Sequence, residues 1–228
     1  MESIICIIVS LVAIIMLKFI FKINLKKAKA IEENKEAERI TNKFPENIHI
    51  VKEMLKMLGN EKVKIEEEKD TKTSLYVAIT NKIFVADLKN NYGRIQTIAH
   101  ECIHSCQDRR LLMFNFIFSN FSILYFLTIT TLTLFNFIHN TTLQLVILLL
   151  IFFIQVIVRS ILEIDAMTKS KFLAKDYIEK KNLCSEEELN YLMNEYEQVN
   201  KLGIPFMVYT FLLQSLIKII IYSIMSLI

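Results

Sequence analysis

Long apolar runs alternate with charged stretches along the 228-residue chain. A bilayer-spanning helix needs roughly 18 or more consecutive apolar residues, and four runs have that length. They cover residues 4–21, 111–138, 143–162 and 204–228. The second run carries no charge, the third carries only Arg159, and the fourth carries only Lys218. The pattern predicts four transmembrane helices.

The first charged stretch, residues 23–110, combines two periodicities. Residues 28–58 have helical apolar spacing, with a break at Pro45. VKIEEEKD and SLYVAITNKIFVAD then alternate apolar and polar positions, which predicts strands. Thr80-Asn81-Lys82 is a candidate hairpin turn within the second of them. RIQTIAHECIHSCQDRR, residues 94–110, returns to helical spacing.

The second charged stretch, residues 163–203, is helical throughout in its pattern. Ser185 and Glu188 have the spacing of a capping box, which marks a helix start. Gly203 and Pro205 predict a break before the last span. We therefore expect a mainly α, polytopic membrane protein with a small β-hairpin region. Its expected segments are an anchor (1–22), a cytosolic segment (23–110), a transmembrane hairpin (111–162), a cytosolic helical segment (163–203) and a final span (204–228).

Charge predicts the orientation in the cell membrane. The first run lacks a basic start and a small-residue cleavage site, so it is a retained anchor, not a signal peptide. Lysines follow it, Arg109 and Arg110 precede the second run, and the loop FIHNTTLQ has neither Lys nor Arg. The positive-inside rule then predicts that both termini lie outside and both charged stretches lie in the cytosol.

Composition supports a lipid bilayer as partner and argues against nucleic acid. Hydrophobic residues make up 53% of the chain, with only three Gly and two Pro. The net charge of +3 is too small to indicate nucleic-acid binding, and the basic residues flank predicted spans. Three of the four cysteines fall in the cytosolic stretches, where thiols stay reduced, so we expect no disulfide framework.

The stretch HECIH, residues 100–104, has the spacing of a metal site. On a helix, residues four apart share a face, so His100 and His104 can direct both imidazoles at one ion about 2 Å away. Glu101 lies beside that face, where it can deprotonate a water without being a ligand. A bound metal lowers the pKa of water toward about 7, which makes this possible at cell pH.

A catalytic zinc needs a third protein ligand, and the sequence offers two candidates. The expected transmembrane hairpin returns the chain beside residues 94–110 at its far end, where Glu163 and Asp165 lie. These two are two residues apart and point in different directions on a helix, so only one is expected to bind. The strand-like stretch upstream could also supply an edge to which an extended peptide adds.

These features resemble the YugP-like family of bacterial membrane zinc metallopeptidases, and more distantly the HtpX and CAAX-prenyl-protease group. In that family an AHEvGHaiQ helix is followed by two spans, an E-F-D-A-S motif and a last span. The matching residues are Ala99, His100, Glu101, His104 and Gln107 in the first motif, and Glu163, Asp165 and Ala166 in the second.

The resemblance implies a membrane-integrated zinc endopeptidase with its site at the cytosolic membrane face. It implies one Zn²⁺ per chain, held by His100, His104 and Glu163, with Glu101 as general base and acid. Asp165 is the candidate for orienting a ligand histidine. The expected substrates are membrane proteins or peptides close to the lipid surface.

Other interpretations stay open. Ile103 stands where the family usually has Gly, and Met167 where it has Ser or Asp. These differences motivate a second hypothesis, a non-catalytic membrane protein with a structural or regulatory metal, which could include Cys102 or Cys106. Arg159 could pair with an acidic residue of the site, stabilise an oxyanion, or extend to the membrane interface, the last being favoured. Lys218 is the basis of a third hypothesis, a transporter.

Overall fold

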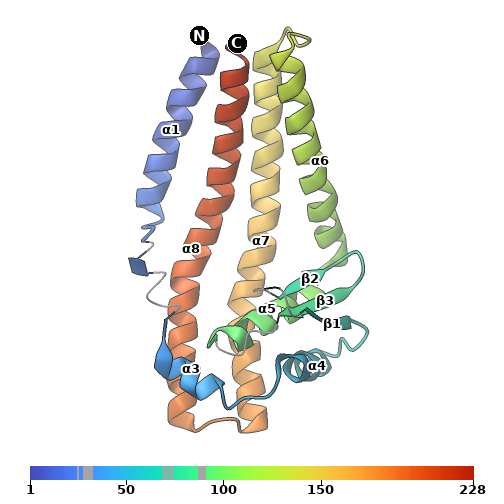
Figure 1. The fold of residues 1–228 in the computed structure, drawn as a ribbon, viewed down its shortest axis with the longest axis vertical. Coiled ribbons are helices and arrows are strands. Elements are labelled where there is room, and N and C mark those ends of the chain that lie inside the picture. The colour runs from blue at the N-terminus through green and yellow to red at the C-terminus, as the bar shows by residue number, and fades with distance from the viewer. Residues whose placement is uncertain (25, 28–32, 69–70, 72–73, 87–90) are drawn as a thin grey trace. The chain divides into compact units, whose positions relative to one another are not determined.

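The computed structural model describes residues 1–228 except 25, 28–32, 69–70, 72–73 and 87–90. Its described part is mainly helical, with a small three-stranded sheet (Figure 1). The chain divides into two compact units. One comprises residues 1–23, 114–161 and 205–228, and the other comprises residues 24–113 and 162–204.

The first unit is a group of long helices. They are α1 (Glu2–Ile20), α6 (Arg109–Leu134), α7 (Thr141–Lys181) and α8 (Glu186–Met225), of which the last three also extend into the second unit. All four are long and apolar enough to cross a membrane, as the sequence pattern predicted. The helices pack through a cluster that includes Phe126, Phe152 and Tyr222. Many other large apolar side chains of these helices are exposed.

Both chain ends lie at the same end of this unit (Figure 1). Ser226 in the last turn donates a hydrogen bond of 2.7 Å to the Ser3 hydroxyl in the first turn of α1. Thr142, at the start of α7, donates to the Glu2 carboxylate. The connection between α6 and α7 therefore shares this end with the two termini.

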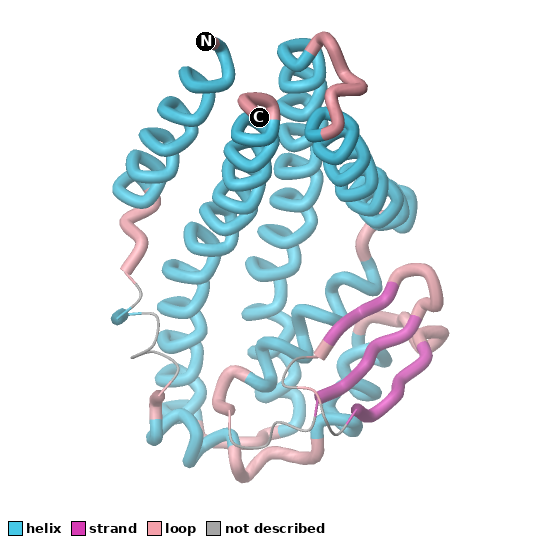
Figure 2. The backbone as a smooth tube through the Cα atoms, turned by 45° about the horizontal axis from the view of Figure 1, so that its top comes forward, coloured by secondary structure: helices cyan, strands magenta, loops and turns pink. Residues whose placement is uncertain are grey.

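The second unit is built around a small sheet and the helix that follows it (Figure 2). Strand β3 (Lys82–Ala86) lies in the middle, parallel to β1 (Lys64–Glu68) and antiparallel to β2 (Leu75–Val77). The predicted hairpin is confirmed as β2 and β3, and Asn81 in its turn has a φ of 48°. The sequence pattern did not reveal that β1 joins β3 from the other side.

Five helical elements contribute to the core of the second unit. They are α3 (Lys35–Thr41), α4 (Asn47–Met57), α5 (Arg94–Cys106) and the parts of α7 and α8 outside the first unit. Together with Ile83 and Val85 of β3, they enclose one core of fully buried side chains. The predicted helix at residues 28–40 lies partly outside the described residues, and its described end forms α3.

Arg94, at the start of α5, is buried and connects this helix to the segment between α3 and α4. Its guanidinium donates to the carbonyl oxygens of Thr41 (2.7 Å), Phe44 (3.1 Å) and Pro45 (2.8 Å), and to Oδ1 of Asn47 (2.6 Å). These acceptors lie where α3 ends and α4 begins, and the Thr41 carbonyl oxygen also accepts from the Phe44 N–H at 3.0 Å. Burial lowers the pKa of Arg94 from its ordinary value.

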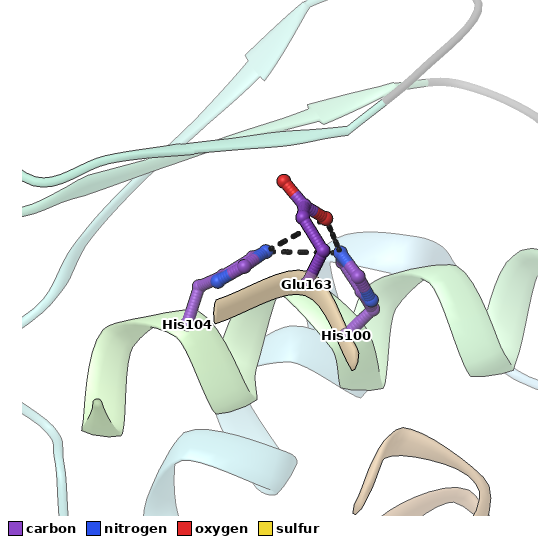
Figure 3. Close-up of side chains that lie close together, drawn as sticks. All are labelled: His100, His104 and Glu163. Atoms are coloured by element: carbon purple, nitrogen blue, oxygen red, sulfur yellow. Dashed lines mark hydrogen bonds and ion pairs between the residues drawn. The ribbon is translucent and has the colours of Figure 1, made fainter. Parts of the chain in front are cut away.

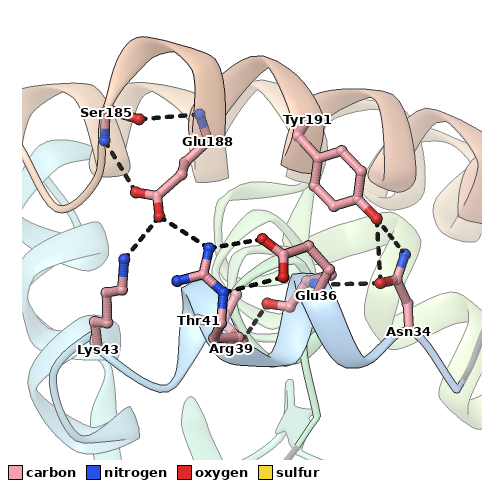
Figure 4. Close-up of polar contacts among 9 residues, drawn as sticks. Asn34, Glu36, Arg39, Thr41, Lys43, Ser185, Glu188 and Tyr191 are labelled. Carbon is pink, nitrogen blue, oxygen red and sulfur yellow. Dashed lines mark hydrogen bonds and ion pairs between the residues drawn. The ribbon is translucent and has the colours of Figure 1, made fainter.

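Polar contacts join α3 to α8 (Figure 4). The Glu188 carboxylate accepts a hydrogen bond from the backbone N–H of Ser185 and forms an ion pair with Lys43, whose Nζ lies 2.7 Å away. The Ser185 hydroxyl accepts from the Glu188 N–H at 3.2 Å, and the Glu188 carboxylate accepts from the Ser185 N–H, which confirms the predicted capping box. Asn34 caps α3 by accepting from the Ala37 N–H, and its amide donates to the Tyr191 hydroxyl.

The predicted break at Gly203 and Pro205 is wrong, because α8 continues through both residues. A proline removes one backbone hydrogen bond, but packing along the rest of so long a helix can maintain it. At Gly203 a Cβ atom would lie 2.8 Å from Cε of Met167 on α7, so the glycine permits close approach of the two helices.

Candidate metal centre

Helix α5 carries the two histidines on the side away from the core. Its apolar residues Ile95, Ile98 and Cys102 are buried in the core of the second unit. His100 and His104 project from the opposite side and direct their Nε2 atoms toward each other, 2.9 Å apart (Figure 3). The helical spacing of four residues produces this arrangement, as the sequence predicted.

Glu163 of α7 completes the cluster. Its Oε2 lies 3.3 Å from Nε2 of His100 and 3.6 Å from Nε2 of His104 (Figure 3). The three side chains are 18%, 13% and 27% exposed for His100, His104 and Glu163, so they are partly shielded but reachable. Of the two carboxylates that the sequence left open, Glu163 is therefore the one that faces both histidines.

The donor set fits a zinc ion or a similar divalent metal. One ligand atom from each residue lies within 4.8 Å of the others. Tetrahedral zinc ligands at bond lengths of about 2.0–2.2 Å are separated by about 3.3–3.5 Å. The two nitrogen–oxygen distances match this value, and the nitrogen–nitrogen distance is a few tenths of an ångström shorter. Three protein ligands leave a position for water or substrate, as in catalytic sites.

Gln107 fixes the protonation of His104. Its amide nitrogen donates to the Leu162 carbonyl oxygen at 2.7 Å and to Oδ2 of Asp165 at 2.9 Å. Its Oε1 therefore faces His104 Nδ1, at 2.8 Å, and an amide oxygen can only accept. Nδ1 of His104 must carry the hydrogen, so the neutral ring would present the Nε2 lone pair to a metal bound in the cluster.

Asp165 acts on this arrangement through Gln107. Its carboxylate receives the Gln107 amide and the Lys169 ammonium, the latter at 2.6 Å from Oδ1. Against the raising effect of burial, these two donors hold the pKa of Asp165 below its ordinary value, so it stays an acceptor. Asp165 thus reaches His104 through Gln107 and not by direct contact.

Glu101 is buried beside the cluster. It is 6% exposed, and its Oε2 accepts a hydrogen bond of 2.6 Å from the backbone N–H of Tyr76 in β2. Burial raises the pKa of Glu101, against the lowering effect of the charges on His100 and His104. A carboxylate with a raised pKa holds a proton more readily, which is what a general base requires.

The charges within the cluster support one another. Burial opposes ionisation of Glu163, but hydrogen bonds with His100 and His104 prevail and lower its pKa well below the usual range. Burial also lowers the pKa of His104, while the hydrogen bonds with Glu163 and Gln107 outweigh that effect and raise it. The three groups thus form a site in which a positive charge is favoured near an ionised carboxylate.

The chain matches no protein-family model, no curated protein and no solved structure.

Other predicted candidates lie apart from the cluster. Cys102 is fully buried in the core, where burial raises the pKa of its thiol, and Cys106 is exposed near the Asn60 amide. Within the described residues, the metal-ligand cluster contains neither cysteine. Arg159 belongs to the first unit, where its guanidinium lies 4.2 Å from the ring centroid of Phe211. No described carboxylate forms an ion pair with it.

Two features of the site had no clear signal in the sequence. Gln107 matched a motif position, but its role depends on the chain leaving the helix there: as the C-cap of α5 it has an extended ψ of 164°, which turns its side chain back toward His104. The contact between Tyr76 and Glu101 joins a strand to a helix, and no local pattern encodes it.

Proposed function

We propose that this chain is a membrane-integrated, zinc-dependent endopeptidase, related to the YugP-like family, whose site faces the cytosol. The observation that carries the proposal is the convergence of His100, His104 and Glu163, with Glu101 buried beside them. The four apolar helices support the membrane location, and the shared end of both termini is compatible with an even number of spans.

His100, His104 and Glu163 hold the metal, which when bound supplies a Lewis acid that polarises the peptide carbonyl and acidifies water. Gln107 and Asp165 keep His104 in the tautomer that presents its lone pair. Glu101 removes a proton from the attacking water and passes it to the leaving amine. Its raised pKa suits it to holding that proton between the two steps.

Strand β2 provides a surface for an extended substrate. It is an edge strand in the order β1-β3-β2, and the Tyr76 N–H points toward Glu101. A peptide that pairs with this edge by backbone hydrogen bonds would pass over Glu101 and the cluster. The chain passes between the apolar helices and the second unit at residues 113–114, 161–162 and 204–205. Because the candidate site is thus joined to the proposed spans by three short connections, we propose membrane proteins or membrane-proximal peptides as substrates.

Metal content and peptide hydrolysis should separate binding from catalysis. We expect about one zinc per wild-type chain in detergent, and much less in His104→Ala and Glu163→Ala. Glu101→Gln should keep the zinc and lose hydrolysis of a quenched-fluorescent peptide library by about 100-fold or more. Glu187→Gln, an exposed glutamate on α8, is the matched control and should behave as wild type. Cleavage that persists in Glu101→Gln would refute the assigned base.

A non-catalytic metal protein is the second candidate, and one contact favours it. The Tyr76 N–H already occupies an oxygen of Glu101, which restricts the freedom of that carboxylate to receive a proton from water. This candidate predicts that zinc binds with the same dependence on His104 and Glu163, but that no peptide is cleaved under any condition. Removal of zinc by a chelator would then lower the melting temperature, and peptide cleavage would be absent both before and after the removal.

A further inference from the structure

A cavity of about 360 Å³ lies within the first unit, between α1, α7 and α8. Its walls include Met16 and Ile20 of α1, Val156 of α7 and Leu212 of α8. Among the described lining residues, Ser215 is the one polar side chain, and its hydroxyl donates a hydrogen bond of 3.0 Å to the Phe211 carbonyl oxygen. The volume lies in the range of about 300–1,000 Å³ that is typical of ligand sites, and the lining can recognise only hydrocarbon.

The cavity separates the second half of α1 from its neighbours. The described hydrogen bonds from α1 to other helices, those of Glu2 and Ser3, are in its first turn. Farther along, Met16 and Ile20 line the cavity and are still 56% and 64% exposed. An occupant of the cavity would therefore supply the packing that this half of α1 lacks.

Two cations on α7 and α8 lie close to residues that line the cavity. Nζ of Lys218 is 5.3 Å from the ring centroid of Phe152, a cavity-lining residue. Arg159 follows the lining residue Val156 by one helical turn and lies over Phe211, the neighbour of Leu212. The two contacts are seven residues apart along each helix, roughly 10 Å at 1.5 Å per residue, and neither cation forms an ion pair with a described carboxylate.

Two uncompensated cations in apolar helices are costly, and an anion between them would remove that cost. A guanidinium and an ammonium together match a phosphate, since arginine donates in a bidentate manner and lysine adds a point charge. We propose that the cavity holds one acyl chain of an anionic phospholipid, whose phosphate lies between Arg159 and Lys218. The lipid joins α1 to α7 and α8. This inference rests on the proposed membrane location but not on the proposed peptidase activity.

Native mass spectrometry of the full chain can count bound lipid. Protein in detergent is exposed to phosphatidylglycerol or to phosphatidylcholine of the same chain length. We expect one retained phosphatidylglycerol per chain, with affinity about tenfold above that for phosphatidylcholine. Arg159→Gln with Lys218→Gln should abolish this preference. Lys52→Gln with Lys180→Gln removes the same net charge at exposed positions of the second unit and should retain it.

A second variant tests the cavity itself. Ala13→Phe places a ring into the cavity from α1 and should reduce retention of both lipids by about tenfold, while an unchanged melting temperature shows that the fold is kept. Equal retention in Ala13→Phe, or a preserved preference in the Arg159 and Lys218 variant, would overturn the proposal. Release of the lipid by excess inorganic phosphate alone, or a lipid-free dimer, would also do so. A chain that stays soluble without detergent would instead refute the membrane location.

Discussion

Gln107 links His104, a proposed metal ligand, to two acceptors on α7, so its amide should tune metal affinity without binding the metal. In Gln107→Leu, His104 loses the acceptor that holds the hydrogen on Nδ1. We expect zinc affinity to fall by about 10–100-fold, the usual effect of losing such a partner. Competition with a fluorescent chelator measures this. Gln198→Leu, an exposed glutamine on α8, should leave the affinity unchanged. Equal affinity in both variants would contradict the role of Gln107.

Arg94 is a structural residue whose loss should destabilise the second unit. Arg94→Met leaves the carbonyl groups of Phe44 and Pro45 without the donor that Arg94 supplies, at about 1–3 kcal/mol each. For a chain of this size we expect a melting temperature lower by about 6–12 °C in detergent. Arg39→Met removes an exposed arginine and should have little effect. Similar melting temperatures for the two variants would argue against the importance of the buried contacts.

At the scale of single residues, the sequence could predict the histidine pair but not the whole site. His100 and His104 are four residues apart on one predicted helix, so the sequence alone predicts that they share a face. The choice between Glu163 and Asp165 is not, because it depends on the rotation of α7 against α5. The structure resolves it geometrically, with Glu163 at 3.3 Å from His100 and Asp165 bonded to Gln107.

At the scale of elements, Gly203 determines how closely α8 approaches α7. Gly203→Ala should be nearly neutral, because the flexible end of Met167 can move and alanine favours the helix by about 0.5–1 kcal/mol. Gly203→Leu should overpack the contact, at a cost of about 1–3 kcal/mol. Thermal melting of Gly203→Leu in wild-type and Met167→Ala backgrounds tests the contact. If the loss is the same in both backgrounds, Met167 is not what the larger side chain meets.

The sequence predicted the helices and the hairpin better than their arrangement. Alternation over Leu75–Val77 and Lys82–Ala86 is a property of adjacent residues, whereas the parallel pairing of β1 with β3 depends on residues far apart. Gly203 and Pro205 are local helix-breaking signals, yet α8 continues through them. Tertiary packing decided both outcomes, and a pattern along the chain cannot encode it.

At the scale of the whole molecule, the proposed orientation can be tested with a single cysteine. Cys106 is exposed in the second unit, whereas Cys102 is buried and its thiol has a raised pKa. In a variant that keeps only Cys106, a membrane-impermeant maleimide should react after permeabilisation and not in intact cells.

The matched control carries its only cysteine at His139→Cys, in the exposed connection between α6 and α7. It should be labelled in intact cells. The reverse labelling pattern would invert the proposed orientation, while labelling of both positions in intact cells would mean that α6 does not cross the membrane between them.

The division of the ligands between α5 and α7 has a consequence for biosynthesis. His100 and His104 leave the ribosome before α6 is made, and Glu163 follows only after the first half of α7. A nascent chain therefore cannot assemble the three-ligand site until the intervening hairpin has been synthesised and has folded back. If the chain is the peptidase we propose, it needs no inhibitory propeptide during synthesis, because completion of its own hairpin is the step that activates it.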